Sequence, residues 1–294
     1  MLVPLLHTAT GSYEFTWHLH PDVVLLCVFL LAGYFYAVTQ LRDRVSDAGR
    51  VKRSQVVLYC SGVFSLYLVA GTPVHDISEQ YLLTVHMFQH TVFTMISPVL
   101  LLAGIPGWMW QALLRPRGAL TIGRALTHPV VAFGMFNGLF VLSHLPEAVN
   151  YALYHHWFHL LVHIGLVATA LLMWWPVLSN VLELPRLGPP LRMSYLFVQS
   201  LLPTVVAAFV TFADGAVYSF YSKAPRMWSL TAVEDQQIAG GVMKLMGSLI
   251  LWGFIAVIFF QWYAQEQAQD QNPASWPEIE DELEALGLTG GSRR

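Results

Sequence analysis

Residues 81–103 read YLLTVHMFQHTVFTMISPVLLLA, an apolar stretch long enough to cross a bilayer as a single helix. His86 and His90 lie four residues apart in it, so their imidazoles stack one turn apart on the same side of the helix. Pro98 is expected to kink the helix below the histidines and to free a backbone carbonyl. Ionisable side chains inside a bilayer are costly and usually functional, so this stretch predicts a membrane helix that carries part of a functional site.

The rest of the chain repeats this apolar character. Of its 294 residues, 55% are apolar and only 11% are charged, whereas a soluble domain has about 25% charged residues. Most of the apolar runs reach the roughly 17–25 residues that a membrane-spanning helix needs. Besides 81–103, the runs lie at 22–41, 55–71, 129–145, 157–178, 193–213 and 239–262. We therefore predict an all-α, polytopic membrane protein with seven transmembrane helices.

Composition divides the chain into three parts. Residues 1–21 precede the first span, and they lack the basic start, continuous apolar core and small-residue cleavage site of a signal peptide. Residues 22–262 are expected to form the seven-helix transmembrane domain. Residues 263–294 are rich in Asp and Glu and predict an acidic tail, with a short amphipathic helix near 276–287.

Basic residues predict how the domain sits in the membrane. Ten of the fifteen Lys and Arg residues fall in the segments 42–53, 115–124 and 186–192. The alternate segments 72–80 and 146–156 contain none. The positive-inside rule places the basic segments in the cytoplasm, so the N-terminus is expected outside and the C-terminus in the cytoplasm. An odd number of spans agrees with ends on opposite sides.

A second histidine pair, His159 and His163, opens the span at 157–178 with the same spacing. With the predicted topology, both pairs lie near the outer face, and only His128 of the twelve histidines lies on the cytoplasmic side. A single membrane histidine is most often a packing group, but two pairs at matching depth favour a metal or haem site. If the two helices lie side by side, four imidazole nitrogens converge on one point. We predict a metal site there, with His86, His90, His159 and His163 as ligands.

The last span adds a strip of polar and thioether side chains. Met243 is predicted to be a further ligand, and Gly240, with Gly241 and Gly247, is expected to admit a neighbouring helix closely. Asp235 is expected either to orient a ligating imidazole through its other ring nitrogen or to cap a helix N-terminus. Six residues are weaker candidates for the metal site: His75, Met87, His155, His156, Asp235 and Gln236.

The ligand types favour copper. Imidazoles suit copper, zinc, iron and nickel, and added methionines favour copper(I). Neither pair reads H-E-x-x-H, which excludes the zinc proteases, and no phosphate-binding loop, nucleophile elbow or dinucleotide fingerprint is present. We therefore expect metal binding and delivery rather than an enzyme, and no nucleic-acid partner. Two alternatives stay open: a membrane di-iron oxidase or desaturase-like enzyme, whose histidine boxes the run at 155–163 resembles, and a bis-histidine haem protein for electron transfer.

Three stretches resemble the signatures of the CtaG family of polytopic cytochrome c oxidase assembly proteins. They are HMFQHTVFTMISPVLLLAGIP at 86–106, HWFHLLVHIGLVATALLMWWPVL at 156–178 and EDQQIAGGVMKL at 234–245. The resemblance covers roughly residues 15–262, in matching order and with the same number of spans. Lys244 departs from the family pattern, which more usually has an aromatic residue there, and His155 and His156 enlarge the histidine cluster.

This resemblance implies a metallochaperone that helps to mature the copper centres of a haem-copper oxidase. It would act as a multi-pass protein of the bacterial plasma membrane, with its metal site facing the extracytoplasmic side. The implied partners are cytochrome c oxidase subunits, other copper chaperones and the lipid bilayer, with a homo-oligomer as a further possibility. Carried over by position, the ligands would be the four histidines of the two pairs, and Asp235, Gln236 and Met243 would be the polar and thioether members of the third motif.

Overall fold

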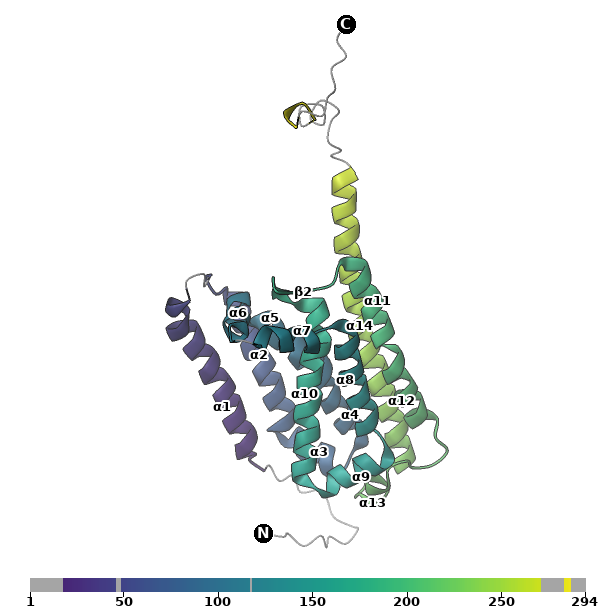
Figure 1. Cartoon of the computed structure of the whole chain (residues 1–294). Coiled ribbons are helices and arrows are strands. Elements are labelled where there is room, and N and C mark those ends of the chain that lie inside the picture. The colour runs from purple at the N-terminus through teal and green to yellow at the C-terminus, as the bar shows by residue number, and fades with distance from the viewer. Residues whose placement is uncertain (1–17, 46–48, 117, 271–282, 287–294) are drawn as a thin grey trace.

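Apolar stretches of the chain fold as long helices that lie side by side in the computed structural model (Figure 1). The structure describes residues 18–45, 49–116, 118–270 and 283–286. The helices of the bundle are α1 (Pro21–Tyr36), α2 (Arg53–Ala70), α4 (Leu83–Thr91), α5 (Ser97–Gly104), α8 (Pro129–Ser143), α10 (His156–Leu178), α11 (Pro189–Gln199), α12 (Leu201–Phe212) and α14 (Ala232–Asp270).

Shorter elements lie at the two ends of this bundle. At one end are α3 (Pro73–Gln80), α9 (Pro146–Tyr154) and α13 (Ser219–Lys223) (Figure 1). At the other end are α6 (Gly107–Leu114), α7 (Ala119–Leu126) and the antiparallel pair of β1 (Asn180–Val181) and β2 (Leu184–Pro185). The helix α3 packs against α4, which carries the first histidine pair.

The structure confirms the predicted all-α class, and six of the seven predicted spans coincide with long apolar helices. Among the described residues, six helical stretches are long and apolar enough to cross a membrane by themselves. They are Pro21–Arg44, Arg53–Ala70, Leu83–Gly104, His156–Leu178, Pro189–Phe212 and Ala232–Ala268. The predicted span at 129–145 differs, because α8 passes only together with α7, to which it is bent by 66°. The count is therefore six, or seven if the bent pair is one span.

Pro98 frees a backbone carbonyl in the helix that carries the first histidine pair, as predicted. A π-helical stretch at Val92–Ile96 joins α4 to α5 just before this proline. Pro98 has no N–H to offer the carbonyl of Thr94 four residues earlier, and the indole Nε1 of Trp174 donates to that carbonyl instead at 2.9 Å. This bond ties α10 to the α4–α5 span. Trp174 and its neighbour Trp175 are both buried.

Glycines set two close helix approaches. A Cβ on Gly104 of α5 would lie 2.7 Å from the Cα of Tyr59 in α2, and a Cβ on Gly240 of α14 would lie 2.8 Å from the carbonyl oxygen of Ala207 in α12. The prediction for Gly240 is therefore confirmed. Gly241 and Gly247 face open space, so they do not contribute to this contact.

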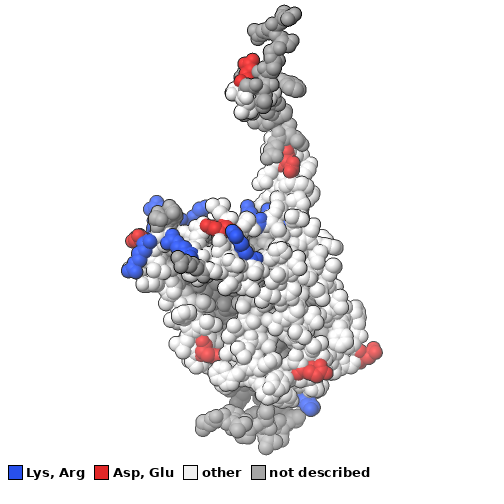
Figure 2. All heavy atoms as spheres, in the orientation of Figure 1, with Lys and Arg blue, Asp and Glu red and all other residues white. Residues whose placement is uncertain are grey.

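Charge is distributed unevenly over the described surface. Lys and Arg side chains gather at the end that carries α6 and α7, while the opposite end shows mostly acidic side chains (Figure 2). The helix α14 continues past the predicted span end at 262 to Asp270, so the start of the predicted acidic tail is helical. The helix predicted near 276–287 lies outside the described residues apart from 283–286.

Candidate metal centre

Four buried histidines from two helices meet near one end of the bundle. The pair on α4, His86 and His90, has ring centroids 4.3 Å apart, and the pair on α10, His159 and His163, has them 4.1 Å apart. Each of the four offers one ring nitrogen, and these nitrogens all lie within 4.8 Å of one another. The i, i+4 spacing stacks each pair along its helix, and the packing of α4 against α10 brings the pairs together. We call this group the four-histidine cluster.

The two pairs match in depth across the helix contact. The rings of His86 and His159 are stacked with centroids 5.3 Å apart and an interplanar angle of 6°. One turn further along, Nε2 of His90 lies 3.1 Å from Nε2 of His163. Each helix thus supplies one ring at each level, which is the convergence that the sequence pattern predicts.

A carboxylate from α3 orients one of these rings. Oε1 of Glu79 lies 2.7 Å from Nδ1 of His159. The carboxylate can only accept, so Nδ1 carries the proton and Nε2 of His159 keeps its lone pair. That Nε2 atom is buried and has no hydrogen-bond partner. A histidine that is oriented through its other nitrogen by a carboxylate is the usual arrangement for a metal ligand.

The same carboxylate also accepts from His75. Nε2 of His75 lies 3.2 Å from Oε1 of Glu79, and the amide nitrogen of Gln89 lies 3.0 Å from Nδ1 of His75. Burial alone raises the pKa of the Glu79 carboxyl, but the hydrogen bond from His159 and the nearby imidazoles outweigh burial and hold that pKa at about 2. Glu79 is therefore an ionised carboxylate held by two histidines. The sequence reasoning missed it, although its i, i+4 spacing from His75 was a visible signal.

Asp235 holds the helix of the first histidine pair. Its Oδ2 accepts from the backbone N–H of Leu83 at 2.8 Å and its Oδ1 from that of Thr84 at 3.0 Å. These are free donors at the first turn of α4, where a carboxylate is favourable. Of the two roles expected for Asp235, the structure shows capping, and the capped helix is α4 rather than its own helix. Its oxygens are engaged with backbone groups and not with a ring nitrogen.

The remaining candidate ligands lie around the cluster. Gln236 accepts from the N–H of Val217 at 2.7 Å and donates to the carbonyl of Val210 at 3.0 Å, so it joins α14 to α12 and its following loop. His155 is exposed and its Nδ1 lies 2.8 Å from the carbonyl oxygen of Tyr151. His156 is exposed too, while Met87 and Met243 line a pocket on the far side of His90.

The four-histidine cluster fits a metal ion. Nδ1 of His86 and Nε2 of His159 are buried without a hydrogen-bond partner in the described structure. Buried lone pairs without donors are unfavourable, and a bound cation satisfies them. Imidazole nitrogens suit copper, zinc, iron and nickel. Among the described residues, this is the one group of His, Cys, Asp and Glu side chains with ligand atoms close enough to hold an ion.

Comparison with known proteins identifies the family. Residues 32–265 match the family model described as the cytochrome c oxidase caa3 assembly factor, and the chain belongs to this family. The resemblance stated from the three sequence stretches is thus confirmed.

Three uncharacterized mycobacterial proteins are similar to the chain. The proteins of Mycobacterium bovis and Mycobacterium tuberculosis are each 25% identical over 279 residues, which cover 88% of this chain and 41% of the relative. The protein of Mycobacterium leprae is 23% identical over 273 residues, which cover 85% of this chain and 40% of the relative. The chain thus spans about two fifths of the length of these relatives. No solved structure matches it.

Proposed function

We propose that this protein binds copper at the four-histidine cluster and delivers it to cytochrome c oxidase during assembly of the oxidase. Membership of the oxidase assembly factor family supports the destination. The single observation that carries the metal-binding role is the meeting of four buried imidazole nitrogens within 4.8 Å of one another. Copper is the cargo here, and the protein acts as its carrier rather than as an enzyme.

The charge distribution supports an extracytoplasmic site in the plasma membrane of a bacterium. The positive-inside rule assigns the end with α6 and α7, where Lys and Arg gather, to the cytoplasm. His86 and His159 lie one turn inside the start of α4 and α10, at the opposite end of the bundle. Copper that reaches the membrane from outside would meet the cluster first, and an oxidase subunit or another copper chaperone would dock at the same end.

The ligand chemistry supports transfer rather than permanent storage. The cluster holds imidazoles and no thiolate, so each ligand can be replaced singly by a ligand of the receiving protein. Glu79 keeps the proton of His159 on Nδ1, which leaves Nε2 free to bind and release the metal.

The two alternative functions need a larger site. A haem would have to fit between its two axial imidazoles, whereas the facing nitrogens of His90 and His163 are 3.1 Å apart. A di-iron centre needs ligands for two ions, and the ligand group in the described residues consists of four histidines. A carrier of single copper ions fits these dimensions better.

The test removes one histidine from each helix. The full-length double variant H86Q/H159Q, purified in detergent, is expected to lose the copper whose X-ray absorption spectrum shows nitrogen ligands only. Membranes of cells that carry this variant should also lose oxidase activity. The matched control H155Q/H156Q changes two exposed histidines at the start of the same α10 and should keep both. Unchanged copper content in H86Q/H159Q, with the variant present in the membrane, would contradict the proposal.

A further inference from the structure

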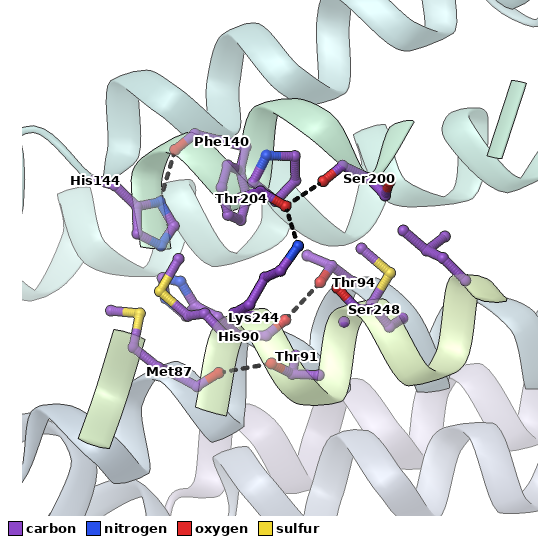
Figure 3. Close-up of a pocket in the computed structure, with 15 residues that line it drawn as sticks. Met87, His90, Thr91, Thr94, Phe140, His144, Ser200, Thr204, Lys244 and Ser248 are labelled. Carbon is purple, nitrogen blue, oxygen red and sulfur yellow. Dashed lines mark hydrogen bonds between the residues drawn. The ribbon is translucent and has the colours of Figure 1, made fainter. Parts of the chain in front are cut away.

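A small pocket lies on the other side of His90 from the four-histidine cluster. It is lined by side chains of α4, the following Val92–Ile96 stretch, α8, α12 and α14, and has a volume of about 30 Å³ (Figure 3). This space accommodates an ion or one or two water molecules, and it is too small for an organic ligand. The pocket side chains that matter here are Met87, His90, Thr204, Met243 and Lys244, together with His144.

His144 directs a bare nitrogen into this pocket. It ends α8 and is buried, and its Nδ1 lies 2.7 Å from the carbonyl oxygen of Phe140. A carbonyl only accepts, so the proton of His144 sits on Nδ1 and Nε2 keeps a lone pair. That Nε2 atom is buried with no hydrogen-bond partner. A buried lone pair in this position calls for a cation or a water molecule.

A second histidine ring and thioethers surround His144. The rings of His144 and His90 meet edge to face with centroids 5.5 Å apart. Figure 3 shows the side chain of Met87 directed to the same end of the pocket as these two rings. Met243 of α14 adds a second thioether to the lining.

Three threonine hydroxyl groups around the pocket donate to backbone carbonyls. Thr91 donates to the carbonyl of Met87 at 2.9 Å, Thr94 to that of His90 at 2.8 Å, and Thr204 to that of Ser200 at 2.6 Å. The ammonium group of Lys244 donates to Thr204 at 2.6 Å (Figure 3). The three hydroxyl protons are thus engaged away from Nε2 of His144, whereas Lys244 keeps two further N–H donors. The positive charge of Lys244 disfavours a divalent ion more strongly than a monovalent one.

We propose that His144, Met87 and Met243 form a second site that binds Cu(I). One imidazole and two thioethers are soft ligands of the kind that copper(I) prefers, and the site lies beside the four-histidine cluster. The ring of His90 separates the two sites, with Nε2 3.1 Å from Nε2 of His163 on the cluster side. A Cu(I) ion in the second site would therefore lie one ring away from the cluster, and its movement between the sites requires no change of oxidation state. This inference rests on the proposed function for the source of the ion.

The test counts Cu(I) ions in the full-length, detergent-purified protein under reducing, oxygen-free conditions. We expect the wild type to bind two Cu(I) per chain, with Cu–S scattering in the X-ray absorption spectrum. M87L/M243L keeps side-chain volume and removes both sulfurs, and H144N keeps a donor for the Phe140 carbonyl and removes the ligand nitrogen. Each of these two variants should bind one Cu(I) fewer, and M87L/M243L should lose the Cu–S signal. M173L, which changes a buried methionine of α10 outside the pocket lining, is the matched control and should behave as the wild type.

The outcomes separate the two proposals. Copper in the wild type that shows nitrogen ligands only and disappears in H86Q/H159Q would overturn the second site and leave the proposed function intact. Copper with sulfur ligands that persists in H86Q/H159Q and disappears in M87L/M243L supports the second site. A second Cu(I) that persists in both M87L/M243L and H144N would overturn it, as would a pocket that holds water alone.

Discussion

Glu79 connects the four-histidine cluster to His75, which lies outside the cluster. It lies on α3, outside the spans, and its Oε1 accepts from His75 and from His159 of α10. A carboxylate in this position fixes the tautomer of the ligand and raises its basicity. The site therefore depends on a residue that does not itself belong to the ligand group.

Replacing Glu79 tests this dependence. E79L removes both the charge and the acceptor, and we expect it to weaken copper binding about 10–100-fold, as for other carboxylates that orient a ligand. E79Q keeps an acceptor oxygen and should lose less. The measurement is a copper titration with a competing chelator. E147Q changes an exposed glutamate at the same end of the bundle and should bind as the wild type; equal affinity in E79L would show that Glu79 does not position the ligand.

Asp235 should matter through stability. D235A leaves the N–H groups of Leu83 and Thr84 without their acceptor, so we expect the free energy of unfolding to fall by about 0.5–2 kcal/mol. Chemical denaturation in detergent, followed by tryptophan fluorescence, measures this change. D214A alters an exposed aspartate in the loop after α12 and serves as the control. An unfolding free energy in D235A that matches D214A would argue against the capping role.

Helix contacts decide how the histidine pairs meet. The α4–α5 span, α10, α12 and α14 approach one another where small residues or internal hydrogen bonds allow it. Gly240 is one such approach, because a Cβ there would lie 2.8 Å from the carbonyl oxygen of Ala207 in α12.

Substituting this glycine should separate α14 from α12. A Cβ at Gly240 collides with Ala207 and Thr211, and we expect G240A to cost about 1–3 kcal/mol of stability through overpacking. The neighbouring G241A meets open space and gains helix propensity, so it should be neutral or stabilising. Thermal unfolding of the two purified variants makes the comparison. Similar melting temperatures would mean that α12 and α14 pack less tightly than the structure indicates.

Periodicity predicted the parts of the site that lie along single helices. The spacing of His86 and His90 and the missing N–H of Pro98 are local properties, and both led to correct expectations. Glu79 and His144 were not predicted as site residues. Glu79 lies on the short helix α3 and His144 follows the end of α8, so only tertiary packing brings them near the cluster. The partner of Asp235, α4, is more than a hundred residues away in the chain, and no local pattern encodes that distance.

Charge asymmetry describes the molecule as a whole and gives a test of its orientation. After Cys27 and Cys60 are replaced by alanine, a membrane-impermeant maleimide added to intact cells should label D214C and should label E183C only after permeabilisation. These positions are exposed and lie at opposite ends of the described bundle. The opposite labelling pattern would place the four-histidine cluster on the cytoplasmic side and contradict the proposed delivery route.

Removing metal should leave the fold intact. The described bundle buries a continuous core, including Phe136, Met173 and Leu196, that does not involve the cluster. We therefore expect a copper chelator to leave the helical circular dichroism signal unchanged, in contrast to small domains that need a metal to fold. Bound copper should still raise the unfolding free energy, by about 2.7 kcal/mol at a free concentration one hundred times the dissociation constant. A loss of helix on chelation would show that the metal organises the bundle.

The hydrogen bond from Trp174 to Thr94 has a consequence for repeated use. It clamps the two histidine-bearing spans together below the cluster through groups that never touch the cargo. In the proposed carrier, this bond would hold the four rings in place after an ion departs, so that no rearrangement would have to precede reloading. Such a carrier would empty and refill many times at a rate governed by its donor and acceptor proteins.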